Sequence, residues 1–330
     1  MAASTVLVAG GAGYIGSHAV KALRAAGHRV VIFDNLSAGH REAALETPLI
    51  VGDIRDVEAV RRAIRQSGAT AVMHFAAWLS VPDSVRDPIG YYRNNVQGAL
   101  AVLEAMSSEN CKHFVFSSTC AVYGEPIETP LRESHPKNPI NSYGQTKLAV
   151  EQALPHFERA YGISWVALRY FNAAGADPDG EIGEDHDPEI HVIPRSLAAA
   201  ANGTPIDIFG EDYPTPDGTC LRDYVHVMDL ADAHIRALRR LESGGSSNAY
   251  NVGTEQPSSV RQVIDAVERV TGKKLERRSS PRRPGDPAIL YASAERVRND
   301  LGWIPQRPQL DTIVADAWNW HSRRPRGYQG

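Results

Sequence analysis

The feature that most constrains the fold is a glycine-rich turn near the start of the chain. Residues 8–18 read VAGGAGYIGSH, and Gly10, Gly13 and Gly16 follow a short apolar run at intervals of three. In a strand–turn–helix unit, the first glycine permits a tight turn, the second a close backbone approach, and the third close helix packing. Free N–H groups at the helix start would then bind a pyrophosphate. The flanking patterns favour this dinucleotide site over a plain glycine-rich turn.

The first half of the chain alternates between two kinds of pattern. Short apolar runs rich in β-branched residues are separated by helix-like segments, which is typical of a parallel sheet covered on both faces. The predicted strands lie at 5–9, 29–34, 49–53, 71–76, 113–117 and 165–171, and the predicted helices at 18–26, 57–66, 91–106 and 145–161. The expected fold class is α/β, with a Rossmann-type doubly wound parallel sheet.

The second half has a different texture, rich in Pro, Gly and Asp up to residue 218. We expect a dinucleotide-binding domain over 1–175, which also receives part of 225–255. Residues 176–330 would form mainly a smaller α/β substrate domain. Helices are expected in this half of the chain at 193–201, 230–241, 259–271, 293–301 and 310–320, with a strand at 249–252.

Composition narrows the class of protein. The 330 residues carry a net charge of −4, which gives no general reason to expect nucleic acid or an anionic membrane as partner. No apolar run reaches the roughly 18 residues of a membrane span, and a signal-peptide pattern is lacking. Cys111, Cys120 and Cys220 show no paired spacing. We therefore expect a cytoplasmic protein with reduced thiols.

Acidic residues end the second and third predicted strands. Asp34 lies 18 residues after Gly16, where a carboxylate accepts hydrogen bonds from a ribose 2′-OH and repels a 2′-phosphate. The predicted cofactor is therefore NAD rather than NADP. Asp53 and Ile54 end the third strand, where we expect the adenine edge.

Two further motifs suggest proton transfer. SYGQTK places Tyr143 and Lys147 at i and i+4, on one face of a predicted helix, and FSSTCAVYG ends a predicted strand with Ser117, Ser118 and Thr119. An unperturbed tyrosine has a pKa of about 10 and is a poor base at neutral pH. A lysine ammonium and a cationic nicotinamide nearby would lower that pKa. Thr119 would hydrogen-bond the reacting oxygen.

The motifs together resemble those of a known family. GGAGYIGSH, FDN, GDIRD, HFAA, YYRNNV, FSSTCAVYG, SYGQTK, LRYFNAAGADPDG, DGTCLRDYVHVMDLADAH and RRPGD follow one another over nearly the whole chain. In this order they are similar to the motifs of the extended short-chain dehydrogenase/reductases, and most closely of the UDP-glucose 4-epimerases. The resemblance implies reversible epimerisation at sugar C4 through a transient 4-keto intermediate, with NAD held tightly throughout.

The resemblance also implies roles for individual residues. The catalytic set is Thr119, Tyr143 and Lys147. The cofactor set comprises Gly10, Gly13, Tyr14, Ile15, Gly16, Asp34, Asn35, Asp53, Ile54, Phe75, Ala76, Ala77, Asn94, Tyr143, Lys147 and Tyr170. The substrate set comprises Thr119, Tyr143, Asn172, His191, Val192, Phe209, Arg222, Arg283, Asp286 and Leu290. Guanidinium groups also match the oxygens of a UDP diphosphate on chemical grounds alone. A homodimer packed through 91–106 and 145–161 is implied as well.

Three positions depart from the pattern of the family. Leu79 stands where the best-known members have a lysine that reaches the nicotinamide ribose, which bears on cofactor retention. His191 replaces an asparagine beside the nucleotide. Leu290 stands at a position that gates the sugar pocket.

Other functions remain as alternatives. A dehydratase would carry an acid just after the strand-end threonine, but Cys120 and Ala121 follow Thr119 here. An epimerase for UDP-N-acetylglucosamine, UDP-glucuronate or UDP-xylose/UDP-arabinose is a closer alternative. A non-catalytic NAD-sensing module would be expected to have lost Tyr143 or Lys147.

No metal site is expected. EDHDPEIH, residues 184–191, contains several ligand types, but Pro188 breaks any helix that would align His186 with His191. We interpret this segment as a polar loop of the substrate domain. The basic run RRSSPRRPG at 277–285 is short, so phosphate binding by Arg283 is favoured over a nucleic-acid site.

Overall fold

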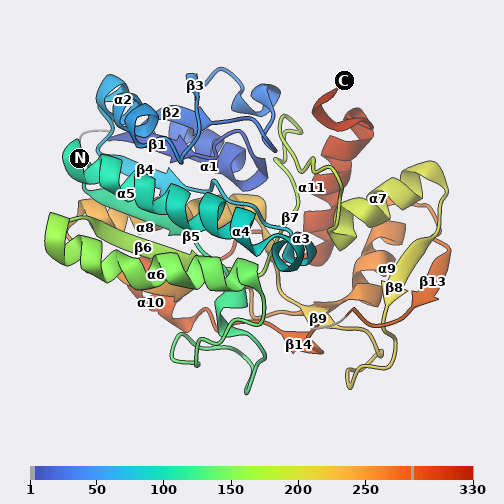
Figure 1. The fold of residues 1–330 in the computed structure, drawn as a ribbon. Coiled ribbons are helices and arrows are strands. Elements are labelled where there is room, and N and C mark those ends of the chain that lie inside the picture. Colours follow the sequence, from blue (N-terminus) through green and yellow to red (C-terminus); the bar gives the residue numbers. More distant parts are fainter. Residues whose placement is uncertain (1–3, 284–285, 330) are drawn as a thin grey trace.

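A computed structural model describes residues 4–283 and 286–329. Its centre is a seven-stranded parallel sheet in the order β11-β6-β5-β4-β1-β2-β3 (Figure 1). The strands are β1 (Thr5–Ala9), β2 (Arg29–Asp34), β3 (Leu49–Val51), β4 (Ala71–His74), β5 (His113–Ser117), β6 (Ser164–Arg169) and β11 (Asn248–Asn251). The predicted Rossmann-type α/β fold is confirmed: all neighbouring strands are parallel, and the order in which successive strands are added reverses between β1 and β4.

Alternate residues of each strand fill two separate cores. In β1, Val6 and Val8 join the core under α1 (Tyr14–Ala25), α8 (Val227–Glu242) and α10 (Glu295–Leu301). Leu7 and Ala9 join the opposite core, under α2 (Val57–Ser67), α5 (Gly98–Ser108) and α6 (Ser142–Tyr161). Successive side chains of a strand point to opposite faces, so a buried strand needs apolar residues at both parities.

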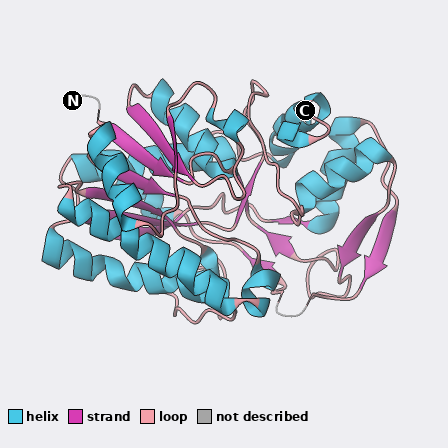
Figure 2. Ribbon diagram, turned by 45° about the horizontal axis from the view of Figure 1, so that its top comes forward, coloured by secondary structure: helices cyan, strands magenta, loops and turns pink. Residues whose placement is uncertain are grey.

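A second group of elements lies beside the carboxyl ends of the sheet strands (Figures 1 and 2). It contains α7 (Val192–Asn202), α9 (Val260–Thr271), α11 (Leu310–Arg323), and the parallel pair β8 (Ile206–Phe209) and β13 (Arg277–Ser280). These helices share a third apolar core. Short strands connect the two groups: β7 (Asn172–Ala174) with β10 (Tyr224–His226), and β12 (Ser258–Ser259), β9 (Leu221–Arg222) and β14 (Ile289–Leu290).

Some elements differ from expectation. The single helix predicted at 91–106 is three consecutive segments: α4 (Pro88–Tyr91), the π-helix η2 (Tyr92–Gln97) and α5. A preceding helix, α3 (Val81–Arg86), and the pair β8 and β13 were not predicted. The sequence of β13 is RRSS, so this strand lacks the alternation of apolar and polar residues from which strands are predicted. Short 3₁₀ segments complete the elements: η1 (Arg41–Ala44), η3 (Cys120–Tyr123) and η4 (Gly327–Gln329).

Among the described residues, no helix is both long enough and apolar enough to cross a membrane.

Candidate active site

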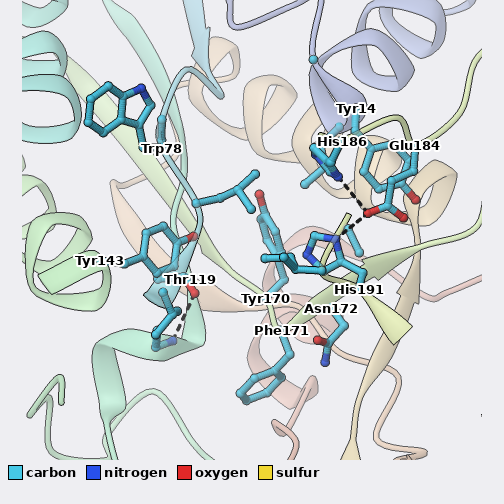
Figure 3. Close-up of a pocket in the computed structure, with 18 of the residues that line it drawn as sticks. Tyr14, Trp78, Thr119, Tyr143, Tyr170, Phe171, Asn172, Glu184, His186 and His191 are labelled. Carbon is cyan, nitrogen blue, oxygen red and sulfur yellow. Dashed lines mark hydrogen bonds and ion pairs between the residues drawn. The ribbon is translucent and has the colours of Figure 1, made fainter. Parts of the chain in front are cut away.

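A cavity of about 1070 Å³ lies between the carboxyl ends of the sheet strands and the second group of elements. Its wall includes every residue predicted for the cofactor and the substrate, with the exception of Asp53. Figure 3 shows side chains from both groups pointing into this space. Such a crevice at the carboxyl edge of a doubly wound sheet is the usual location of a ligand site.

Each glycine of the N-terminal turn has its own structural reason. Gly10 has φ +79°, and a Cβ there would overlap the backbone of Ala76. A Cβ on Gly16 would overlap the carbonyl oxygen of Gly10, so the close packing of α1 on the turn requires glycine. Around Gly13, in contrast, the nearest atom to a Cβ is Gly10 O at 3.5 Å. Gly13 lines the cavity, so its missing side chain leaves space for a ligand rather than for the protein.

The start of α1 is open to that ligand. Gly13 is its N-cap and makes no side-chain capping hydrogen bond. The first N–H groups of a helix have no partner within the helix, and they attract anions. At the end of β2, Asp34 accepts hydrogen bonds from Ala12 N at 3.0 Å and Leu36 N at 2.8 Å, and its side chain lines the cavity. The turn and Asp34 therefore fit the phosphates and ribose of a dinucleotide.

The prediction that Asp53 ends the third strand is wrong, while its role at the adenine edge stays a prediction. Asp53 does not line the cavity; its carboxylate accepts hydrogen bonds from Arg55 Nε at 2.8 Å and Asn35 Nδ2 at 3.2 Å. These bonds, the Arg55 guanidinium above all, lower the pKa of Asp53 to about 2. Because β3 ends at Val51, two residues earlier than predicted, Asp53 lies in the following turn. Ile54 still lines the cavity.

The predicted catalytic residues meet at the opposite wall. Asn141 caps α6 by accepting a hydrogen bond from Gly144 N at 2.9 Å, which places Tyr143 in the first turn and Lys147 one turn later. Lys147 Nζ donates to Ser117 O at 2.8 Å, so the end of β5 positions the ammonium. Thr119 caps η3 and accepts from Ala121 N at 3.1 Å. In Figure 3 the Tyr143 and Thr119 side chains lie side by side.

Burial dominates the acid–base properties of this wall. It raises the pKa of Tyr143 to about 12, although a hydrogen bond with the Thr119 hydroxyl opposes the rise. It lowers the pKa of Lys147 to about 7, with the negative charge of Glu151 opposing. The sequence predicts that Lys147 lowers the pKa of Tyr143. In the protein alone that lowering is absent, because the phenol is taken out of water and Lys147 is directed to Ser117 O.

Two other predicted cofactor residues are held by unusual local structure. Asn94 lies in the π-helix η2, where it lines the cavity and donates to Asn95 Oδ1 at 3.0 Å. π-Helical turns inside helices are often found at functional sites. Tyr170 forms a hydrogen bond with the Ser117 hydroxyl, and burial raises its pKa.

The far end of the cavity carries positive charge. Arg222 of β9 forms an ion pair with Asp286, which lies three residues before the start of β14, the strand that pairs with β9. Arg283 lies with its guanidinium 4.1 Å from the centre of the Phe209 ring. Pro284 and Gly285 of the RRPGD motif lie outside the described residues. Leu290, the register partner of Arg222, also faces the cavity.

Sequence reasoning missed several residues of the cavity wall. Arg195 lies 5.8 Å from the Phe209 ring and adds a further positive charge. The sequence did contain an indication of this position, because Arg195 is a basic residue one helical turn after His191. Trp78, Glu184, His186 and Glu189 also line the cavity.

The segment 184–191 differs from the interpretation as a simple polar loop. No helix forms there, as expected, yet the ligand atoms of Glu184, His186, Glu189 and His191 lie within 4.8 Å of one another. Pro188 does prevent a helix that would align the two histidines, but the bent chain places their ring centres 5.3 Å apart without one. Burial disfavours charge on His191, but Glu184 and Glu189 outweigh it and raise its pKa to about 10.

Comparison with known proteins supports this arrangement. The family model described as NAD dependent epimerase/dehydratase family matches residues 6–253. A UDP-glucose 4-epimerase of Lacticaseibacillus casei is 49% identical over 326 residues, covering 98% of each chain. A UDP-glucose 4-epimerase from Brucella ovis in complex with NAD has a TM-score of 0.93 at 45% identity, covering 96% of this chain and 98% of that one. The enzyme from Bifidobacterium longum in complex with NAD+ and UDP has a TM-score of 0.92 at 35% identity, covering 98% and 100%.

Proposed function

This chain belongs to the NAD dependent epimerase/dehydratase family, and on that premise we propose that it catalyses the reversible C4 epimerisation of UDP-glucose and UDP-galactose. The observation that carries the proposal is the position of Thr119, Tyr143 and Lys147. They line one cavity between an open helix start and an arginine-containing end. Relatives named UDP-glucose 4-epimerase match over nearly the whole chain, which supports the same assignment.

NAD bound at the glycine turn would supply a hydride acceptor that returns the hydride to the other face of a 4-keto sugar. Gly13, the start of α1 and Asp34 would hold its phosphates and ribose, and Asn94 and Tyr170 would border its reactive end. Leu79, at the position of the expected lysine, also lines the cavity.

The protein's own residues would handle the proton. Tyr143 Oη would accept the proton of the sugar 4-hydroxyl and return it when the configuration has been inverted. Thr119 Oγ1 would hydrogen-bond the reacting oxygen and keep it beside the phenol. Lys147, held by Ser117 O, contributes positive charge when protonated.

Charge at the far end would hold the UDP group. Arg222 and Arg283 are suited to the diphosphate, because guanidinium groups form paired hydrogen bonds with phosphate oxygens. Asp286, now the ion-pair partner of Arg222, would instead contact the uridine ribose. Phe209, Asn172, His191 and Val192 border the same part of the cavity.

The other functions have less support. Cys120 and Ala121 follow Thr119, and Cys120 is a buried thiol whose pKa burial raises further. The position therefore lacks the proton donor that elimination of water requires. Epimerisation of UDP-N-acetylglucosamine or of UDP-xylose/UDP-arabinose remains the alternative substrate assignment.

The purified protein should interconvert UDP-glucose and UDP-galactose without added NAD, and acid treatment should release NAD or NADH. NMR of the products identifies the epimer directly, and UDP-N-acetylglucosamine and UDP-xylose serve as comparison substrates. If the main product formed from UDP-glucose carried a 4-keto-6-deoxy sugar, the proposal would be contradicted. A dependence on added NADP would contradict it as well.

Leu290 should set the preference between sugars. Leucine is smaller than tyrosine, so Leu290 leaves some space for an N-acetyl group. The leucine side chain, however, offers the acetamide no hydrogen bond. A misfit of about 1–3 kcal/mol lowers specificity roughly 10- to 200-fold, so UDP-glucose should be preferred over UDP-N-acetylglucosamine by about that factor. Leu290→Tyr should abolish the weaker activity and leave the main one, as measured by kcat/KM for both pairs.

Ile289 offers a matched control for that experiment. It precedes Leu290 on β14 and is absent from the cavity wall. Ile289→Tyr should therefore leave the substrate ratio unchanged. A wild-type preference for the N-acetyl pair, or an unaltered ratio in Leu290→Tyr, would show that Leu290 is not the gate.

The enzyme is further proposed to form a homodimer through the helices at 91–106 and 145–161. Support comes from Val85, Ile89 and Tyr92, which are exposed on the neighbouring segments α3, α4 and η2. Large exposed apolar residues that lie close together often mark an interface. Light scattering that gives the mass of a single chain at micromolar concentration would contradict this.

The cytoplasm is the proposed location. The three cysteines are unpaired and buried, which fits a compartment that keeps thiols reduced. Cell fractionation tests this assignment, and recovery from an extracellular fraction would contradict it.

A further inference from the structure

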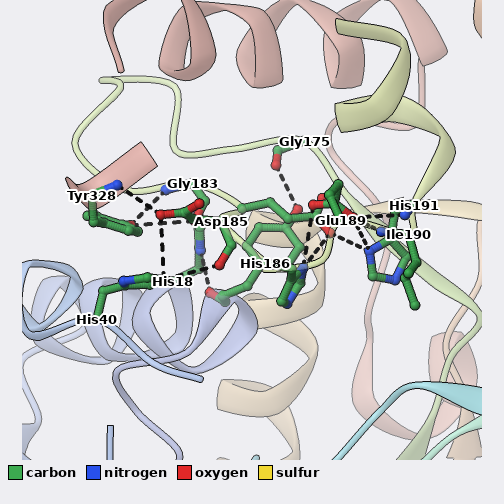
Figure 4. A network of polar contacts seen from close by, with 12 residues as sticks. His18, His40, Gly175, Gly183, Asp185, His186, Glu189, Ile190, His191 and Tyr328 are labelled. Carbon is green, nitrogen blue, oxygen red and sulfur yellow. Dashed lines mark hydrogen bonds and ion pairs between the residues drawn. The ribbon is translucent and has the colours of Figure 1, made fainter. Parts of the chain in front are cut away.

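Four side chains form a compact group at the boundary between the glycine turn and α7. This Glu–His cluster consists of Glu184, His186, Glu189 and His191 (Figure 4). Glu184 Oε1 lies 3.2 Å from His186 Nδ1 and 2.8 Å from His191 Nδ1. Glu189 Oε2 lies 3.6 Å from His186 Nδ1, and Glu189 Oε1 lies 3.0 Å from His191 Nδ1. Each carboxylate therefore faces both imidazoles.

Only part of the cluster is satisfied by hydrogen bonds: His191 Nδ1 and Glu189 Oε1 form one, whereas Glu184 and His186 each keep an unpartnered atom. The Glu184 side chain is only 6% exposed, and its Oε1 is buried without a hydrogen-bond partner among the described residues. His186 Nδ1 is likewise buried and has no hydrogen-bond partner among the described residues. Their separation of 3.2 Å would suit a hydrogen bond, but the direction does not. A buried polar atom without a hydrogen-bond partner is costly, which favours a further ligand at these two atoms.

We propose that the Glu–His cluster is a binding site for a divalent transition-metal ion, with Zn²⁺ as the best match. Two imidazole nitrogens and two carboxylate oxygens are a donor set that Zn²⁺ accepts with tetrahedral geometry. Bonds of about 2.0–2.2 Å in a tetrahedron place neighbouring ligand atoms roughly 3.3 Å apart. The four separations of 2.8–3.6 Å lie around that value. Two carboxylates also balance the charge of the ion.

The surroundings indicate a positioning role for the ion. The Tyr14 ring, the first residue of α1, packs edge-on against His186 with 6.1 Å between ring centres. The Tyr14 hydroxyl donates to Gly175 O at 2.6 Å. His191 is the N-cap of α7. An ion at the cluster would therefore link the glycine turn to the beginning of α7. All four ligands line the cavity, which provides a route from solvent.

A neighbouring acidic group shows what a satisfied cluster looks like. Asp177, Asp179 and Glu181 also lie close together, but Lys21 Nζ contacts all three at 2.7, 2.9 and 2.7 Å. Their charge is already matched by a cation of the protein. The carboxylates of the Glu–His cluster face two histidines instead, and histidine in its neutral form is also a metal ligand, so we assign the metal to this cluster.

Metal analysis of the full-length protein tests the proposal, and it does so independently of the enzymatic activity. The protein is purified without metal-affinity chromatography, treated with a chelator and then dialysed against Zn²⁺. The bound metal is measured by mass spectrometry. One Zn²⁺ per chain is expected. Glu184→Gln keeps the side-chain shape but removes the charge, and the affinity for Zn²⁺ should fall at least about 100-fold, since even an outer-shell change costs 10- to 100-fold.

Glu181→Gln is the matched control, because it lies three residues away, is 53% exposed and belongs to the Lys21 group. Its affinity for Zn²⁺ should equal that of the wild type. A wild type with less than stoichiometric Zn²⁺, or equal binding by Glu184→Gln, would overturn the proposal.

Cobalt provides a readout that needs no variant. Wild-type protein loaded with Co²⁺ should show the intense visible absorption of a four-coordinate site, and its melting temperature should rise because the ion binds the folded state. Pale six-coordinate Co²⁺ with no change in melting temperature would mean binding at surface histidines only, and would exclude the site.

Discussion

Replacing Tyr143 with phenylalanine should lower the rate of epimerisation by about 10²- to 10⁴-fold, the usual contribution of a positioned general acid or base. The substitution keeps the ring, which is partly buried in the cavity wall, and removes only the hydroxyl beside Thr119. The fold and the binding of UDP-sugar should therefore persist. Steady-state kinetics should show the loss mainly in kcat, while circular dichroism remains that of the wild type.

Tyr161→Phe is the control for this experiment. Tyr161 ends the same helix, α6, but is half exposed and lies outside the cavity wall. Removing the Tyr161 hydroxyl should leave the rate of epimerisation unchanged. Near-native turnover in Tyr143→Phe would mean that another group moves the proton.

The pKa of Tyr143 also determines how much electrostatic stabilisation the phenolate needs before it can act as a base. With a pKa of about 12 the phenol is neutral at pH 7. Lowering that pKa to about 7 requires differential stabilisation of the phenolate by roughly 7 kcal/mol, at about 1.4 kcal/mol per unit. Burial lowers the pKa of Lys147 to about 7, so only part of the positive charge of this lysine is present at neutral pH. Positive charge brought into the cavity with the ligands must therefore supply a large share.

The second large effect is expected at the glycine turn. Gly13→Ala should lower the affinity for NAD at least about 100-fold without unfolding the protein. A Cβ there meets Gly10 O at 3.5 Å, which is ordinary contact, so the fold has room for the methyl group. The ligand does not, because the close approach of the phosphates to the helix N–H groups is lost. Overpacking and a lost charge-assisted hydrogen bond cost about 1–3 kcal/mol each.

Two other glycines separate ligand binding from stability. Gly10→Ala should lower the melting temperature as well as NAD content, because φ is +79° and the added carbon would overlap Ala76. Gly27 has φ +88° with no atom within 4 Å of a Cβ, so Gly27→Ala should cost some stability and leave NAD content unchanged. The readouts are thermal melting and the NAD released by acid. Normal NAD content in Gly13→Ala would contradict the assigned role of the turn.

Local features of this protein were readable from the sequence. The glycine turn, the alternating apolar runs and the i, i+4 spacing of Tyr143 and Lys147 depend on residues close together in the chain. Backbone sterics and helix periodicity act over that range, so β1 begins and ends as expected, and α6 carries both catalytic candidates on one face. The strand that ends at Val51 rather than Asp53 shows the limit of such reasoning at element boundaries.

Other features depend on contacts between distant segments, and only the tertiary structure decided them. Arg222 and Asp286 are 64 residues apart and pair because β9 and β14 are neighbours. The Glu–His cluster arises because a turn, not a helix, closes around Pro188 against the glycine turn. The pKa of Tyr143 rises because packing removes water from the phenol, and burial is a property of the whole fold. Sequence spacing specifies which side chains share an element, whereas packing specifies which of them share a site and how strongly their charges interact.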